Sequence, residues 1–187
     1  MSHFPGLTNH LLIAMPAMGD PNFHRTVTLV CEHSEEGALG IVINRPLDIR
    51  MGDIFEQLEL AEPVGDIFQR HVLNGGPVQQ ERGFVLHRPK REWDSMLKVS
   101  DEIGVATSRD ILAAIAEGDG PSESLVALGY AGWTAGQLEA EMQANAWLSA
   151  PATGEIVFNT PFESRWYSAA RLVGVDIGLM SSEAGHA

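Results

Sequence analysis

Cys31 and His33 are the first pair of residues whose types and spacing could do chemistry. Alternate residues of a strand face the same side, so a thiol and an imidazole would lie together there. Such a pair can be an activated nucleophile or half of a metal site. No second cysteine and no nearby His-x-x-His pattern completes a zinc site. The favoured alternative is a buried strand cysteine followed by a hairpin histidine.

Asn44 and Arg45 place an amide and a guanidinium at the end of a predicted strand, directly before Pro46. Polar groups at strand ends often line a binding site. They equally suit a turn in which Asn44 satisfies backbone groups and Arg45 pairs with an acid. The two interpretations carry equal weight.

Gly75 and Gly76 follow another predicted strand, and Arg82 comes six residues after the second glycine. Paired glycines permit positive φ and a close approach of the backbone to a ligand, and Arg82 could clamp an anion. The sequence has neither a Walker loop nor a Gly-x-Gly-x-x-Gly dinucleotide fingerprint. A structural turn, with Pro77 ending the strand, is therefore favoured over an anion site.

Gln137 and Glu141 stand one turn apart at the edge of a predicted helix, near Trp133 and Trp147. They could line a groove for a partner or a ligand, although core filling by both tryptophans is favoured. Elsewhere no two carboxylates form a recognisable acid/base arrangement, and no Gly-x-Ser-x-Gly elbow is present. The sequence therefore predicts no catalytic set, no metal site and no cofactor.

The elements that must position these residues are predicted from hydrophobic periodicity and from turn and cap signals. Strands come first in paired runs, and helices do not alternate strictly with them. This order favours an α+β fold with a mostly antiparallel or mixed sheet, which can be barrel-like, over a doubly wound fold. The expected strands cover residues 11–15, 26–31, 38–44, 70–73, 83–87, 103–106, 124–130 and 155–159, and the expected helices cover 51–58, 107–118, 134–148 and 160–173.

The 187 residues suit one domain, because no linker, repeat or low-complexity stretch divides them. A loose tail is expected from about Ser181. The single cysteine cannot form an internal disulfide, which favours a reducing, cytoplasmic location. The apolar run at residues 11–15 is too short to span a bilayer, so we expect no membrane association.

The net charge is −13, from 25 acidic and 12 basic residues. Affinity for nucleic acids comes largely from lysine and arginine side chains that neutralise phosphates, so this balance argues against direct nucleic-acid binding. The one basic cluster consists of Arg88, Lys90 and Arg91 beside Trp93, and short charge runs of this kind are usually solvated loops.

The sequence contains several glycine-punctuated blocks. They are residues 12–23, 31–33, 37–40, 44–46, 75–78, 82–87, 127–133, 136–139, 145–148, 165–166 and 185–187. Together these blocks resemble the AlgH/YqgE family of bacterial proteins. The resemblance implies an α+β architecture with a bifurcated, partly barrel-like sheet surrounded by helices. It also implies the family's description as a transcriptional regulator, and it implies no catalytic residues.

The leading functional hypothesis is a non-enzymatic binding or regulatory module that acts through a protein partner or a small ligand. A DNA-binding transcriptional regulator is the first alternative, which the charge balance disfavours. The second alternative is an enzyme that uses Cys31 as a nucleophile, or that binds a phosphate substrate at Gly75, Gly76 and Arg82.

Overall fold

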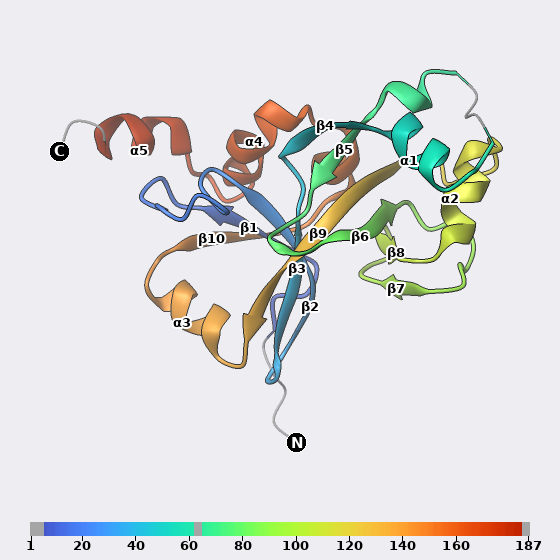
Figure 1. The fold of residues 1–187 in the computed structure, drawn as a ribbon. Coiled ribbons are helices and arrows are strands. Elements are labelled where there is room, and N and C mark those ends of the chain that lie inside the picture. Colours follow the sequence, from blue (N-terminus) through green and yellow to red (C-terminus); the bar gives the residue numbers. More distant parts are fainter. Residues whose placement is uncertain (1–5, 62–64, 185–187) are drawn as a thin grey trace.

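The computed structural model describes residues 6–61 and 65–184, with side chains described through Met180. Its strands form one curled sheet, and the helices pack around this sheet (Figure 1). The strands are β1 (His10–Ala14), β2 (Val27–Ser34), β3 (Gly37–Val42), β4 (Pro46–Arg50), β5 (His71–Asn74), β6 (Val78–His87), β7 (Met96–Lys98), β8 (Gly104–Ala106), β9 (Ser124–Thr134) and β10 (Trp147–Pro151). The helices are α1 (Met51–Gln57), α2 (Arg109–Ala116), α3 (Gln137–Gln143), α4 (Arg165–Arg171) and α5 (Ile177–Ala184).

The long strand β9 is the centre of the sheet, whose main path runs β10-β1-β2-β3-β9-β6-β8-β7. One edge of β9 pairs with β6. The other edge pairs first with β5, where Leu73 lies opposite Ala127, and then with β3, where Ala38 lies opposite Trp133. The sheet therefore forks at β9, and one arm consists of β5 and β4 (Figure 1). Only the β5–β9 pair is parallel among the described strands, which confirms the predicted mostly antiparallel α+β class.

Both faces of the β1–β2 region are buried. Leu11 and Leu29 contribute to the first core cluster, whereas Leu12 and Val30 contribute to a separate cluster on the opposite face. Helices cover both faces, because α4 and α5 pack on the first cluster and α3 packs on the opposite one. A further cluster joins α1 and α2 to β6, β8 and β9. The alternating residues of β1 and β2 are thus apolar on both faces, as expected for strands buried on both sides.

The helix predicted over residues 134–148 is wrong in its second half. α3 ends at Gln143, and Asn145 takes a left-handed conformation with φ 57°. The Ala146 amide donates to the Glu141 carbonyl and the Asn145 amide donates to the Met142 carbonyl, which is the Schellman pattern of a helix C-terminus. The chain then reverses into β10, which pairs with β1 and had no counterpart among the predicted strands.

The strand predicted over residues 155–159 is also wrong, because these residues form a single π-helical turn. Ile156 and Val157 are both buried although they are adjacent, and a short apolar run of this kind fits a helix as well as a strand. The next predicted helix begins as a 3₁₀ turn at Phe162–Ser164 and continues as α4. α5 carries the chain through Ala184, where a loose tail was expected from about Ser181, and residues 185–187 lie outside the described part.

Candidate functional site

A β-bulge separates Cys31 from His33. The pairing of β2 with β3 shifts between Val30 and Glu32, so Cys31 is the extra residue. Cys31 belongs to the first core cluster, whereas His33 lies opposite Ala38, which packs on the other face of the sheet. The expectation that both side chains face the same side is therefore wrong. Simple alternation fails here because the bulge adds one residue to the strand.

The Cys31 thiol is enclosed in the core, with the residue only 2% exposed. Burial, reinforced by the nearby charge of Glu32, raises the pKa of Cys31 to about 12. A thiol with this pKa is protonated at neutral pH, and the thiolate is the form that attacks substrates. The geometry contradicts a nucleophilic role for Cys31.

We expect Cys31 to resist iodoacetamide at neutral pH in the native protein. Alkylation should be at least about a hundredfold slower than in the urea-unfolded chain, because the native thiol is both buried and protonated. The chain has one cysteine, so the mass increase measured by mass spectrometry reports this site alone. Similar rates for the native and unfolded chains would show that the thiol is accessible.

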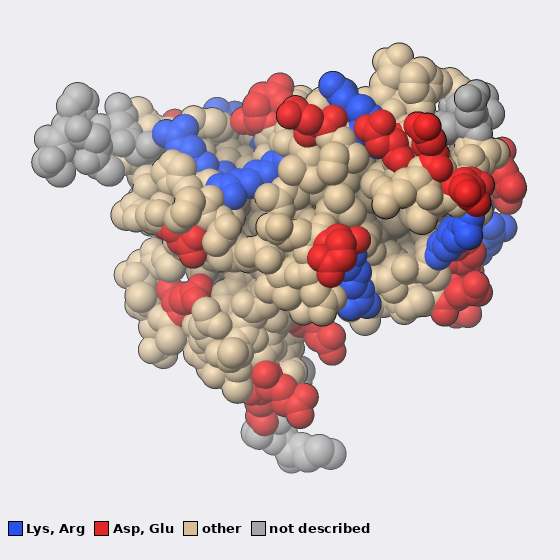
Figure 2. Space-filling view, in the orientation of Figure 1, with Lys and Arg blue, Asp and Glu red and all other residues tan. Residues whose placement is uncertain are grey.

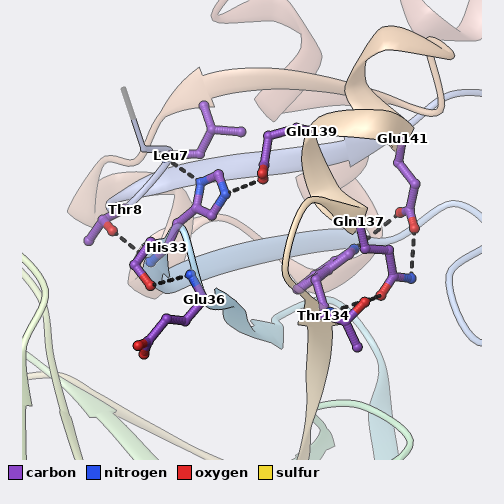
Figure 3. Close-up of polar contacts among 10 residues, drawn as sticks. Leu7, Thr8, His33, Glu36, Thr134, Gln137, Glu139 and Glu141 are labelled. Atoms are coloured by element: carbon purple, nitrogen blue, oxygen red, sulfur yellow. Dashed lines mark hydrogen bonds and ion pairs between the residues drawn. The ribbon is translucent and has the colours of Figure 1, made fainter. Parts of the chain in front are cut away.

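His33 uses both ring nitrogens inside the fold (Figure 3). The Leu7 amide donates to Nδ1 at 2.9 Å, so the ring proton lies on Nε2. Nε2 donates to Oε1 of Glu139 at 2.6 Å. These contacts tie the chain before β1 and the helix α3 to the β2–β3 hairpin. The His33 side chain is 2% exposed, so it acts as a structural link between these segments.

Gln137 and Glu141 lie together, and their polar groups are also engaged within the fold (Figure 3). Oε1 of Glu141 accepts hydrogen bonds from the indole N–H groups of Trp133 at 3.1 Å and Trp147 at 2.9 Å. Its Oε2 accepts a hydrogen bond from Nε2 of Gln137. Oε1 of Gln137 in turn accepts the Thr134 amide. Both tryptophans are buried, so Glu141 satisfies two indole donors at the edge of the core.

Asn44 and Arg45 fasten the loop that precedes β2. The Asn44 side chain accepts the Val27 amide at 2.9 Å. Burial lowers the pKa of Arg45, and the charge of Asp20 opposes that shift. Arg45 donates hydrogen bonds to the carbonyls of Asn22 and His24. The amide group of Asn44 donates to the Arg25 carbonyl. The two residues therefore satisfy turn backbone, although the acid pairing expected for Arg45 is replaced by carbonyls.

Gly75 and Gly76 lie at the fork of the sheet. The Gly75 amide donates to the Leu128 carbonyl, and the Gly76 amide donates to the Asn74 side chain. Both glycines are buried, so these amides are directed at the protein and not at an anion. Arg82 is exposed, lies 5.2 Å from the centre of the Phe84 ring, and donates to Gln79 at 3.5 Å. The glycines fit the structural turn that the sequence favours.

A large concavity lies beside α1 and was not among the predicted sites. Its volume is about 920 Å³. Arg50 fixes one wall, because its guanidinium donates to the Gln69 carbonyl and its amide donates to Asp53. Phe68 is 44% exposed there. The lining residues are Arg50, Gly52, Asp53, Phe55, Glu56, Leu60, Ala61, Phe68 and Gln69, and we call this site the α1 cleft.

The sequence contains little signal for the α1 cleft. The apolar stripe of α1 is visible in the sequence, and the structure confirms that Met51 and Phe55 are buried. The facing wall comes from Leu60, Ala61, Phe68 and Gln69, and the last two belong to a 3₁₀ turn at Ile67–Gln69. This part of the sequence follows no regular hydrophobic period. Within residues 6–61 and 65–184, no three histidine, cysteine or acidic side chains are grouped so that they could hold a metal ion. In the same part of the chain, no helix is long and apolar enough to cross a membrane.

The fold and these contacts define an α+β protein with a forked, curled sheet, whose most recognisable polar residues hold its segments together. The AlgH-like family model matches residues 11–178, and the chain belongs to this family. A UPF0301 protein of Nitrosococcus oceani is 54% identical over 179 residues, which cover 96% of each chain. One from Saccharophagus degradans is 53% identical, covering 98% of this chain and 90% of the relative.

Two solved structures have the same fold. The solution structure of the AlgH protein from Pseudomonas aeruginosa has a TM-score of 0.80 and 49% identity, covering 100% of this chain and 99% of that one. A crystal structure of a protein from Corynebacterium diphtheriae has a TM-score of 0.74 at 21% identity, covering 97% of this chain and 94% of that one. The second likeness concerns the fold alone.

Proposed function

We propose that this protein is a non-enzymatic, cytoplasmic binding module that takes a small organic ligand in the α1 cleft. The observation that carries the proposal is the cleft itself. Its volume of about 920 Å³ falls in the range of small-molecule sites, which are roughly 300–1,000 Å³. Apolar side chains, including Phe55, Leu60 and Phe68, share its lining with charged ones, including Arg50 and Glu56. This mixture suits a ligand with an apolar body and a few polar groups.

The state of the other candidate residues supports binding over catalysis. The Cys31 thiol is buried and protonated, which removes the nucleophile on which the thiol hypothesis depends. The amides of Gly75 and Gly76 are already bonded within the protein. These observations favour the α1 cleft, which is larger than the other pocket described below and has a mixed polar and apolar lining.

The surface charge supports a small ligand over a nucleic acid. Figure 2 shows acidic and basic side chains interspersed on the described part of one face, without a continuous basic surface. The net charge of −13 would repel phosphates over the whole molecule. Transcriptional regulation through direct DNA contact therefore gains no support from the charge distribution.

Thermal denaturation of the protein with a panel of small metabolites tests this function, together with variants that alter the cleft. At a hundredfold excess over Kd, a ligand should raise the Tm of the wild type by roughly 5–10 °C. Ala61→Trp places a large side chain in the cleft from an exposed position, so it should abolish the shift. Phe68→Ala removes an apolar contact and should weaken it.

Leu97→Ala is the matched control, because Leu97 is 41% exposed, like Phe68, and lies on β7 outside the cleft. This variant should keep the full shift. Equal stabilisation of the wild type and the Ala61→Trp variant by every active compound would place binding elsewhere. A panel without any active compound would contradict the small-ligand proposal and favour a protein partner.

A further inference from the structure

A second pocket, of about 210 Å³, opens where the sheet forks. The parallel pairing of β5 with β9 covers only Leu73 with Ala127 and Asn74 with Leu128. Nearer the amino ends of the two strands, His71 and Val72 of β5 have no partners on β9, so the pairing of β5 with β9 stops there. The pocket is lined there by His71 from β5 and by Ser124 and Leu125 from β9. We call it the fork pocket.

Two of the residues that line the fork pocket carry side-chain donors that the described part of the protein leaves unused. Among the described residues, the Arg70 guanidinium and the Ser124 hydroxyl make no hydrogen bond, ion pair or ring contact. Arg50, by contrast, donates to the Gln69 carbonyl, so the preceding arginine of the chain is already engaged. An unpaired guanidinium beside a hydroxyl is a ready partner for the oxygens of a carboxylate or a phosphate.

The orientation of the His71 ring is fixed. Nδ1 lies 2.8 Å from the Leu47 carbonyl, so Nδ1 carries a proton and donates it in this bond. Nε2 has no hydrogen-bond partner among the described residues, and it can accept a hydrogen bond from a protonated oxygen of a ligand. The pocket thus combines two donors with one oriented acceptor.

The remaining walls are apolar, formed mainly by Met51, Leu125 and Phe162. Met51 is buried, and Phe162 is partly buried against the first core cluster. The volume equals that of about seven water molecules at ~30 Å³ each, so only a compact ligand fits. The fork pocket therefore favours an anionic head with a short apolar body over a free inorganic ion.

We propose that the fork pocket binds a small organic acid, with its oxyanion held by Arg70 and Ser124 and its apolar body against Met51 and Phe162. The pocket shares no lining residue with the α1 cleft, so this inference goes beyond the proposed function and stands apart from it. The oxyanion can be a carboxylate or a phosphate monoester, because both accept from a guanidinium and a hydroxyl.

The test is titration of the ¹⁵N-labelled full-length protein with benzoate, phenyl phosphate and neutral benzamide, followed by NMR. We expect saturable shifts of the His71 and Leu125 amides with one or both acids, and the tighter acid identifies the preferred oxyanion. Benzamide should be at least about tenfold weaker, because it lacks the charge that Arg70 recognises. Arg70→Gln should weaken the acids by about tenfold, and Ser124→Ala should weaken them less.

Arg171→Gln is the control, since Arg171 is an exposed arginine at the end of α4 and does not line the pocket. It should leave the affinity unchanged. Arg70 is also exposed, so its variant should keep the wild-type spectrum away from the pocket. Three results would each overturn the proposal: no saturable shift with either acid, equal binding of benzamide, or full affinity in the Arg70→Gln protein.

Discussion

Replacing Gly76 with alanine is expected to prevent stable folding. A Cβ atom at this position would overlap the carbonyl group of Tyr130 on β9. The backbone there also has φ of +152°, which side-chain-bearing residues rarely adopt. The clash is with main chain, so it can be relieved only by moving β9 or the end of β5 at the fork. We expect a loss of at least about 4 kcal/mol, which is a large part of a typical domain stability.

The measurement is soluble yield together with thermal unfolding followed by circular dichroism. Gly132→Ala is the matched control on β9, because a Cβ there would meet only the Tyr130 ring edge, at an ordinary 3.6 Å. That variant should unfold within a few degrees of the wild type. A Gly76→Ala protein that is equally stable would mean that the segment after β5 does not pack against Tyr130 as described.

Sequence reasoning succeeded where a local signal determines the structure. The β2–β3 hairpin follows from two β-rich runs around a short polar turn, and the structure places that turn at Glu35 and Glu36. The helix α2 follows from its apolar stripe and from Gly118, which indeed has φ of +82°. In both cases the residues that make the pattern also make the contacts.

Prediction from the sequence failed where one residue changes the hydrophobic period, or where long-range contacts determine the local structure. The bulge at Cys31 reverses the facing of His33, and a hydrophobic pattern of period two does not report such an insertion. Asn145 ends α3 in the left-handed conformation, yet the same residue is acceptable inside a helix. β10 is then fixed by its pairing with β1, more than a hundred residues earlier in the chain.

The same distinction explains the site residues. Gly75, Gly76, Asn44 and Arg45 could be recognised as unusual from their types, but their partners could not. The partners of Gly75, Asn44 and Arg45 are backbone groups of β9 and of residues 22–27, which local patterns do not bring together. The α1 cleft depends on how α1 packs against residues outside any strand, and the fork pocket depends on where the pairing of β5 with β9 stops. A sequence pattern reports pairing better than it reports the end of pairing.

Substitution of Arg165 is expected to cause the second large loss of stability. No predicted site included this residue. It is 2% exposed and lies at the start of α4. Its Nε donates to the Thr160 carbonyl at 2.8 Å, and its Nη1 donates to the Ile43 carbonyl next to the end of β3. The guanidinium also lies 4.6 Å from the centre of the Phe162 ring. Arg165 therefore joins the C-terminal helices to the sheet.

We expect Arg165→Met to lower the free energy of unfolding by about 3 kcal/mol. Two opposing terms decide this value. Burial lowers the pKa of Arg165 to about 10, which shows that holding the charge there is costly, and methionine removes that cost. However, the substitution leaves the buried Ile43 carbonyl and the partly buried Thr160 carbonyl without their charged donor, and each such bond contributes roughly 1.5–3 kcal/mol. The lost bonds outweigh the relief, because methionine fills the space but donates nothing.

Urea unfolding followed by tryptophan fluorescence measures the difference, because the four tryptophans are buried and become exposed on unfolding. Arg171→Met, on the exposed last turn of the same helix, should stay within about 0.5 kcal/mol of the wild type. If Arg165→Met were as stable as the wild type, water would have to reach the Ile43 and Thr160 carbonyls. The junction between α4 and β3 would then be solvated, and the attachment of the helix would depend on the indole of Trp166, which donates to the Ala14 carbonyl.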